Sequence, residues 1–128
     1  MAPLPFVPGR HAIESYGNGG FRFAGMSHLG SILATPHGIS AVAAVSIATL
    51  SVEGLAQLFA ELEAAPGSIE LLVLGTGASH AQLPEAVAQR LRASGVRFET
   101  MATGPAARIY NVLVEEGRRI AALLIAVA

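Results

Sequence analysis

Residues 70–75, with the sequence ELLVLG, form the segment that decides the fold. A short, nearly continuous apolar run that is closed by glycine is typical of a strand buried on both faces of a sheet. In the region before this strand, Leu55, Leu58 and Leu62 recur at helical spacing. Ser51, which precedes them, can cap a helix. This region therefore predicts a helix from residue 51 that is followed by a buried strand.

The same alternation continues to the end of the sequence. Pro84 suits the first turn of a second helix, which should end at Gly95. A strand is expected at residues 96–100, a third helix at 103–116 and a last strand at 120–127. Three helix–strand units with short connections predict a layered α/β sheet with right-handed crossovers.

The residues before position 51 are rich in strand patterns. Two strand pairs are expected, namely residues 13–16 with 21–23, and residues 31–35 with 39–44. The first pair is joined by Asn18-Gly19, because both residues tolerate the positive φ of a tight hairpin turn. The proline-rich residues 1–12 predict a flexible arm, and residues 13–128 a single domain.

The composition excludes several chemistries. The chain has 128 residues, of which 8 are basic and 9 acidic, and its formal net charge of −1 disfavours binding to nucleic-acid phosphates. It contains no cysteine, every basic residue other than histidine is arginine, and every acidic residue is glutamate. Thiolate nucleophiles, lysine Schiff bases and aspartate-based triads are therefore excluded.

The hydropathy pattern indicates no transmembrane segment, although the mean hydropathy is +0.55. Charged residues are absent between Arg22 and Glu53, but glycine, proline and histidine interrupt this region. Its longest stretch without such an interruption, residues 39–52, is shorter than the roughly 18 residues that span a bilayer. The N-terminus has no positively charged region of a signal peptide, so we expect a cytoplasmic protein.

Two loops are the best candidates for a ligand site. Residues 75–80 and 101–105 each follow a strand of the predicted parallel pair, so both emerge at the carboxyl edge of the sheet, where α/β proteins bind ligands. Backbone amides, hydroxyls and a guanidinium would meet there, as in pockets for phosphates or carboxylates. The predicted crevice residues are Gly75, Thr76, Gly77, His80, Met101, Thr103, Arg108 and Asn111.

Each crevice residue also has a purely structural interpretation. Glycines after a strand commonly serve a turn, Thr103 fits a helix N-cap, and Asn111 can satisfy a backbone group of a loop. Arg108 near a helix start opposes the helix dipole and needs compensation, either by a carboxylate such as Glu99 or Glu115 or by a bound anion. Both interpretations remain open from the sequence.

No pattern indicates catalysis or a metal site. The four histidines lack metal-ligand spacing. Ser79 is not part of a nucleophile-elbow motif, and its neighbour His80 is badly placed to act as its base. The charged run at residues 115–119 fits a solvated helix end, with a partner-binding patch as the alternative. We therefore expect no catalytic residue, no metal and no cofactor.

Several short motifs resemble those of one family. They are GGF at residues 19–21, GSIL at 30–33, LVLGTG at 72–77, ETMAT at 99–103, AARIYNVL at 106–113 and EGR at 116–118. With these motifs the chain resembles the Mth938-like domain family from about residue 13 to residue 125. The family includes the mitochondrial assembly factor of respiratory complex I and many bacterial proteins of unknown activity.

The resemblance implies a single-domain, three-layer α/β fold, with a mixed sheet between a β-plus-α layer and an α layer. It adds Tyr110, Glu116 and Arg118 to the motif positions and brings no established catalytic residue. Three departures stand out. Ala102 and Ile109 replace an Asp and a Thr that are frequent in the family, and residues 41–45 lack a frequent tryptophan. The missing Asp weakens any acid–base role for this loop.

Two functions follow as hypotheses. The first is a non-enzymatic interaction protein similar to an assembly factor, which forms a homodimer or binds a respiratory-chain or membrane-biogenesis subunit. The second is a protein or enzyme that binds a small anion or small molecule in the crevice between residues 75–80 and 101–108, with Arg108 as the clamp. An exposed apolar patch favours the first, and a concave pocket in which Arg108 has no internal carboxylate favours the second.

Overall fold

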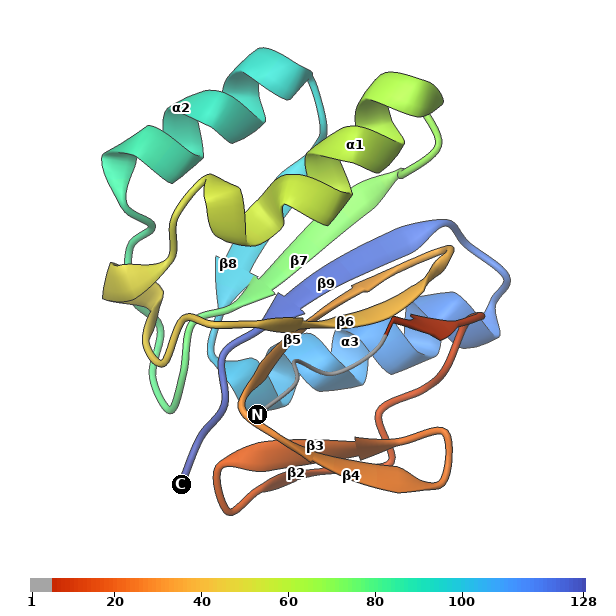
Figure 1. The fold of residues 1–128 in the computed structure, drawn as a ribbon, viewed down its shortest axis with the longest axis vertical. Helices are drawn as coiled ribbons and strands as arrows, with labels where there is room; N and C mark the ends of the chain where they lie inside the picture. Colours follow the sequence, from red (N-terminus) through yellow and green to blue (C-terminus); the bar gives the residue numbers. More distant parts are fainter. Residues whose placement is uncertain (1–5) are drawn as a thin grey trace.

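The computed structural model describes residues 6–128, and its centre is a six-stranded sheet with strand order β1-β6-β5-β9-β7-β8 (Figure 1). These strands are β1 (Val7–Pro8), β5 (Ser31–Thr35), β6 (Gly38–Val42), β7 (Leu71–Gly75), β8 (Phe98–Met101) and β9 (Ile120–Leu124). Strands β1, β6, β5 and β9 pair antiparallel, whereas β9, β7 and β8 pair parallel. The predicted mixed sheet is confirmed.

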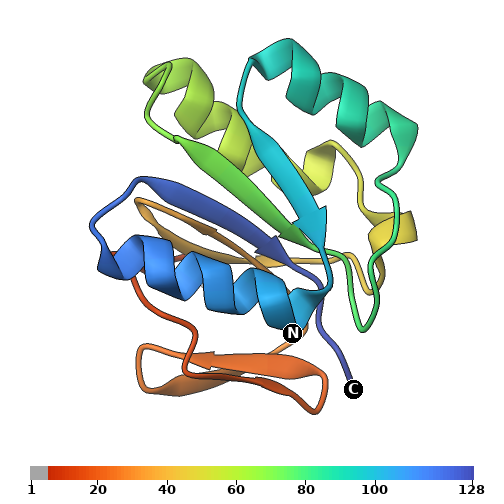
Figure 2. The same cartoon turned by 180° about the vertical axis from the view of Figure 1, so that it is seen from behind.

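Helices cover both faces of this sheet (Figures 1 and 2). Helices α1 (Ala56–Ala64) and α2 (Glu85–Ser94) cover one face, and α3 (Thr103–Glu115) covers the other. A second sheet of three strands packs beside α3, with β2 (Ser15–Gly17), β3 (Gly20–Phe23) and β4 (Met26–Leu29) in that order. The three layers are therefore α, mixed sheet, and β plus α, as predicted.

Strand β7 shows why the apolar run at residues 70–75 needs both layers. Leu72 and Leu74 point into the core under α1 and α2, whereas Val73 points into the core under α3. All three side chains are fully buried. Successive residues of a strand face opposite sides of the sheet, so only a strand with two covered faces can be apolar throughout.

The first predicted hairpin is confirmed, but its sheet contains one more strand than expected. Asn18 and Gly19 form the turn between β2 and β3 with φ values of 52° and 79°. A second turn of the same kind, with φ of 51° at Ala24 and 73° at Gly25, leads into β4. This strand was missed because the side chains of Met26–Leu29 are mostly exposed and carry no alternating apolar pattern.

Several predicted boundaries need correction. The helix expected from Ser51 begins as a 3₁₀ turn at Glu53–Leu55, where the Ser51 hydroxyl accepts a hydrogen bond from the Gly54 N–H, and continues as α1. A further 3₁₀ turn, Ile47–Thr49, precedes it. Strand β8 covers residues 98–101 instead of 96–100. Strand β9 ends at residue 124 instead of 127, because the Ala126 N–H and the Val127 carbonyl bond outside the ladder, to the Ser31 hydroxyl and the Gly19 N–H.

Part of the predicted N-terminal arm belongs to the sheet. Residues 1–5 lie outside the described residues, but Val7 pairs with Ile39 and so adds β1 to the edge of β6. Gly38 allows this close approach, because a Cβ at that position would overlap the carbonyl oxygen of Val7 and the ring of Phe6. The domain boundary at residue 13 stays a prediction.

Candidate functional site

The two candidate loops meet at the carboxyl ends of β7 and β8, as the topology predicts. The N–H of Thr76 donates to the carbonyl of Met101 at 2.8 Å, and the N–H of Thr103 donates to the carbonyl of Gly77 at 2.8 Å. The Thr76 hydroxyl donates to the carbonyl of Ser79 at 2.8 Å and accepts from the N–H of Ala81 at 2.9 Å. We call these residues, 75–81 and 101–103, the loop junction.

Thr103 is the most buried polar residue of the loop junction. Its hydroxyl accepts from the N–H of Gly77 at 3.0 Å and donates to the carbonyl of Ile125 at 2.7 Å. The predicted N-cap is displaced by one position, because Ala102 is the N-cap of α3 and Thr103 is its first helical residue. Thr103 therefore connects three chain segments through one hydroxyl group.

Gly75 is required by this packing. A Cβ at Gly75 would lie 2.9 Å from the Cα of Thr103 and 3.0 Å from the Cδ2 of Leu124. Contacts this short are not tolerated against backbone, so the strand end admits only glycine. At the solvent side, the exposed His80 bonds through Nε2 to the Thr100 hydroxyl at 2.8 Å. The loop junction thus brings six predicted residues together, and many of their polar groups already have internal partners.

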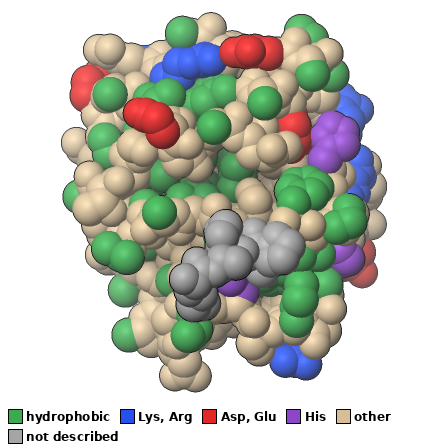
Figure 3. Space-filling view, viewed as in Figure 1, with side chains coloured by type: hydrophobic (Ala, Val, Ile, Leu, Met, Phe, Trp, Pro, Cys, Tyr) green, Lys and Arg blue, Asp and Glu red, His purple; other side chains and the backbone are tan. Residues whose placement is uncertain are grey.

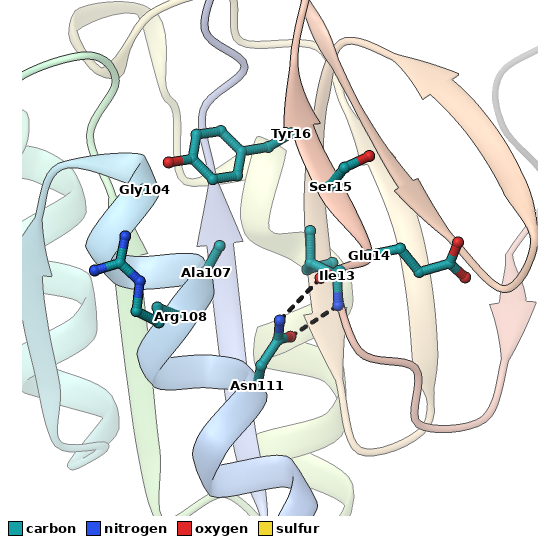
Figure 4. Close-up of a pocket in the computed structure, with 8 residues that line it drawn as sticks. All are labelled: Ile13, Glu14, Ser15, Tyr16, Gly104, Ala107, Arg108 and Asn111. Carbon is teal, nitrogen blue, oxygen red and sulfur yellow. Dashed lines mark hydrogen bonds between the residues drawn. The ribbon is translucent and has the colours of Figure 1, made fainter.

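The two remaining predicted residues, Arg108 and Asn111, line a different pocket. It has a volume of about 320 Å³ and lies between α3 and the strand β2 with the residues before it (Figure 4). Its lining residues are Ile13, Glu14, Ser15, Tyr16, Gly104, Ala107, Arg108 and Asn111. We call it the α3 pocket. The predicted crevice residues are therefore divided between the loop junction and this pocket.

Asn111 has the structural role that the sequence left open. Its Oδ1 accepts from the N–H of Ile13 at 2.8 Å, and its Nδ2 donates to the carbonyl of the same residue at 2.8 Å. The Asn111 side chain therefore satisfies both backbone groups of Ile13, which lies outside the strands and has no strand partner for them. Both bonds are drawn in Figure 4.

Tyr110 holds the same segment from the buried side of α3. Its hydroxyl donates to the carbonyl of His11 at 3.1 Å, while its ring is 1% exposed. Burial raises the pKa of Tyr110 to about 12. This family-motif residue, like Asn111, fastens residues 11–13 to the helix.

Arg108 differs from its neighbours because its charge is not compensated internally. Among residues 6–128 no carboxylate lies within 4.0 Å of its guanidinium, so the pairing with Glu99 or Glu115, one of the two alternatives that the sequence left open, is not formed. Figure 4 shows the Arg108 and Glu14 side chains on opposite sides of the α3 pocket. Glu14 pairs instead with Arg22 at 3.2 Å. Arg108 is exposed and available to a ligand or partner.

The sequence did not single out the polar pocket residues Glu14, Ser15 and Tyr16, nor Gly104 beside them. A Cβ at Gly104 would lie 2.5 Å from the Tyr16 hydroxyl oxygen, so the glycine makes room for the tyrosine over the first turn of α3. A glycine at the second position of a helix is an unfavourable choice for helix formation. A glycine in a position that disfavours it was therefore the sequence feature that could have indicated a close contact at Gly104.

The remaining family-motif residues, Glu116 and Arg118, lie at the far end of α3. Glu116 is the exposed C-cap of the helix, and the guanidinium of Arg118 lies 3.6 Å from Glu70. The Arg119 backbone N–H donates to Glu70 at 2.9 Å. This bond and the charges of Arg119 and Arg118 lower the pKa of Glu70.

A second polar cluster that the sequence did not reveal lies between α1 and the β5–β6 turn. Glu61 is 6% exposed and accepts hydrogen bonds from the Thr35 hydroxyl, the Gln57 amide and His37 Nδ1, each at 2.8 Å. Residues 6–128 contain no group of three or more His or Glu side chains that could hold a metal ion. No described helix is both long enough and apolar enough to span a membrane.

The model of one family, described as a protein of unknown function (DUF498/DUF598), matches residues 13–125. The chain belongs to this family. An uncharacterized protein of Rhodobacter capsulatus is 43% identical over 126 residues, which cover 98% of this chain and 93% of that protein. NADH dehydrogenase (ubiquinone) 1 alpha subcomplex assembly factor 3 of Danio rerio is 37% identical over 113 residues. That match covers 88% of this chain and spans 63% of the length of the Danio protein.

Solved structures agree with the family and with the fold. A crystal structure described as an outer membrane protein of Bartonella henselae has a TM-score of 0.86 at 42% identity and covers 95% of this chain and 99% of that one. A solution structure of a Mth938-like domain from Bordetella pertussis has a TM-score of 0.75 at 25% identity and covers 100% of this chain and 95% of that one. The resemblance to the Mth938-like family and the predicted fold class are confirmed.

Proposed function

We propose that this protein is a non-enzymatic assembly factor that binds a protein subunit of a respiratory or other membrane-associated complex. The Danio relative, 37% identical, is named as an assembly factor of NADH dehydrogenase. The structural observation that carries the proposal is an exposed apolar groove at one end of the central sheet. Grooves of this kind on a surface are typical of sites that bind other proteins.

The groove lies between the residues that follow β6, the turn between β4 and β5, and the C-terminal segment. It has a volume of about 280 Å³ and is lined by Gly19, Gly30, Ser31, Val42, Ala43, Ala44, Val45, Ala126, Val127 and Ala128. None of these side chains is charged. In Figure 3 the lower left of the surface, over the C-terminal segment, carries green hydrophobic side chains and no red or blue ones.

Two large side chains mark this region as unusual for a surface. Val45, in the groove, is 81% exposed, and Leu29, directly before Gly30, is 79% exposed. Exposing a side chain of this size instead of burying it forgoes about 1.5–3 kcal/mol of hydrophobic free energy. Both belong to the stretch between Arg22 and Glu53 that contains no charged residue. A protein partner that covers them would recover that free energy.

The test compares Val45→Glu with Ala93→Glu, a matched charge on the exposed surface of α2. Both positions are exposed, so each variant should fold with a stability within about 0.5 kcal/mol of the original. Tagged proteins are cross-linked in cells of the native host, and the captured subunits are identified. The original protein and Ala93→Glu should capture subunits of a respiratory complex, and Val45→Glu should lose them. Unchanged capture by Val45→Glu would contradict the groove as the binding site.

A second candidate function is the binding of a small anion. The observation that favours it is Arg108, which lines the α3 pocket one turn beyond Gly104 without an internal carboxylate partner. The positive end of the α3 dipole adds to its attraction for an anion. The predicted site at the loop junction remains part of this proposal, although its Gly77 N–H already donates to the Thr103 hydroxyl.

A thermal-shift series with phosphate, nucleotides, sugars and carboxylates tests this candidate. A ligand that binds only the folded protein raises the melting temperature in proportion to the logarithm of its concentration above Kd. The shift should disappear in Arg108→Ala and persist in Arg97→Ala, an exposed arginine elsewhere. A shift that survives in Arg108→Ala would exclude Arg108 as the anion clamp.

A further inference from the structure

The outer face of α3 carries a stripe of exposed side chains, namely Arg108, Ile109, Val112, Glu115 and Glu116. Figure 2 shows α3 crossing the near side of the molecule with no other described helix or strand in front of it. Ile109 is 37% exposed and Val112 50% exposed. These two residues border an apolar hollow of about 340 Å³. We call this set of five residues the α3 stripe.

The charges of the α3 stripe are separated by sign. Arg108 lies in the N-terminal half, and Glu115 and Glu116 lie at the C-terminal end. Eight residues separate Arg108 from Glu116, which is about 12 Å along a helix, so the two cannot pair within one chain. In the part of the chain that the structure describes, none of the three forms an ion pair.

These charges also oppose the dipole of their own helix. Carboxylates at the C-terminal end of a helix and a cation in its N-terminal half are each placed unfavourably. An antiparallel helix laid against α3 would remedy both, because its positive end would meet Glu116 and its negative end would meet Arg108. The partner that fits must therefore present an apolar centre with charges in the reverse order.

We propose that this partner is a second copy of the same chain, bound through the α3 stripes of both copies in an antiparallel pair. In the register centred on Val112, Arg108 of each copy lies opposite Glu116 of the other, and Val112 lies opposite Val112. Ile109 packs beside this central contact. A two-fold axis brings one patch onto itself, so a self-complementary charge pattern is what such an interface requires.

The inference is independent of the proposed assembly function, because the α3 stripe shares no residue with the groove at Val45, but it shares Arg108 with the second candidate function. One helix face buries less than the roughly 1,200 Å² that stable complexes usually bury. The dimer is therefore expected to depend on protein concentration in the micromolar range or above. Salt should weaken it, since two exposed ion pairs contribute to it.

Sedimentation equilibrium over a concentration series tests the dimer. The average molecular mass of the original protein should rise from the 13.1 kDa of one copy towards twice that value as the protein concentration rises. Arg108→Glu and Glu116→Arg should each raise the dissociation constant at least about tenfold, because each variant places like charges opposite each other twice. The double variant, with both changes, should dimerise as the original does.

A mixture of the two single variants is the decisive sample. In a heterodimer of Arg108→Glu with Glu116→Arg both charge pairs are again of opposite sign, so the mean mass of the mixture should exceed that of either variant alone at the same total concentration. Circular dichroism on each variant checks that it is folded. The proposal is overturned by an original protein that remains monomeric at all concentrations, by single variants that dimerise undiminished, or by no gain on mixing. If Arg108 only bound an anion, mixing the two variants would not raise the mass, so this sample distinguishes the dimer from the anion-binding candidate.

Discussion

The loop junction and the α3 stripe differ in how their polar groups are satisfied. At the loop junction the hydroxyls of Thr76 and Thr103 bond to backbone groups of neighbouring segments. On the α3 stripe, among the described residues, Arg108 and Glu116 have no ion-pair partner. An unpaired polar group is costly when it is buried and nearly neutral when it is exposed to water. Changes at the junction should therefore lower stability, whereas changes on the stripe should alter binding.

The largest effect is expected at Gly75. In Gly75→Val the new side chain would overlap the backbone of Thr103, so the free energy of unfolding in urea should fall by about 3 kcal/mol. Gly54→Ala is the matched control, since a Cβ there makes only ordinary contacts, the shortest at 3.6 Å. Equal stability of the two variants would show that the loop junction is not tightly packed.

A smaller effect is expected at Asn111, which lies on α3 between the two regions. Asn111→Ala removes two hydrogen bonds and leaves both backbone groups of Ile13 without them, at a cost of about 2 kcal/mol. Amide exchange at Ile13 should accelerate. Gln89→Ala on the exposed side of α2 serves as the control and should change little. Unchanged protection at Ile13 would mean that Asn111 does not hold this segment.

The smallest of the three effects is expected at Tyr110. At pH 7, Tyr110→Phe loses one hydrogen bond to His11, which costs about 1 kcal/mol. The pKa of Tyr110 is raised from 10.0 to about 12, so the unfolded chain releases the proton before the folded protein does. This stability contribution is complete below pH 10 and is lost as the pH rises towards 12.

Urea unfolding measured from pH 8 to 11.5 checks this effect. The original protein should lose stability above pH 10, and Tyr110→Phe should lose less over the same interval. Parallel loss in the two proteins would show that Tyr110 ionises equally in the folded and unfolded states.

The sequence predicted the fold well where local pattern and topology agree. The apolar run at residues 70–75 indicated a strand with two covered faces, and Asn18-Gly19 indicated the first hairpin. Strand β4 was missed because it is mostly exposed and pairs only with β3, so its side chains carry no periodic signal. The start of the first helix moved because a 3₁₀ turn precedes α1, and β9 ended early where the Ala126 N–H donates to the Ser31 hydroxyl and the Val127 carbonyl accepts from the Gly19 N–H.

The candidate site was predicted in part, for a related reason. The ends of parallel neighbouring strands must share one edge, so the meeting of residues 75–77 with 101–103 followed from topology alone. The pairing of Asn111 with Ile13 depends on how the three-stranded sheet packs against α3, which no local pattern records. The same holds for Glu61, which meets Thr35 and His37 only in the folded protein.

The free energy of unfolding, measured in urea on dilute protein for Thr103→Val and Arg108→Glu, tests the difference between the two regions most directly. Valine keeps the shape of Thr103 but leaves Gly77 N–H and the carbonyl of Ile125 without their partner, so we expect a loss of about 2 kcal/mol. Arg108→Glu, on the exposed stripe, should remain within about 0.5 kcal/mol of the original protein. Equal losses, or a larger loss for Arg108→Glu, would contradict the assignment of the junction to the fold and of the stripe to binding.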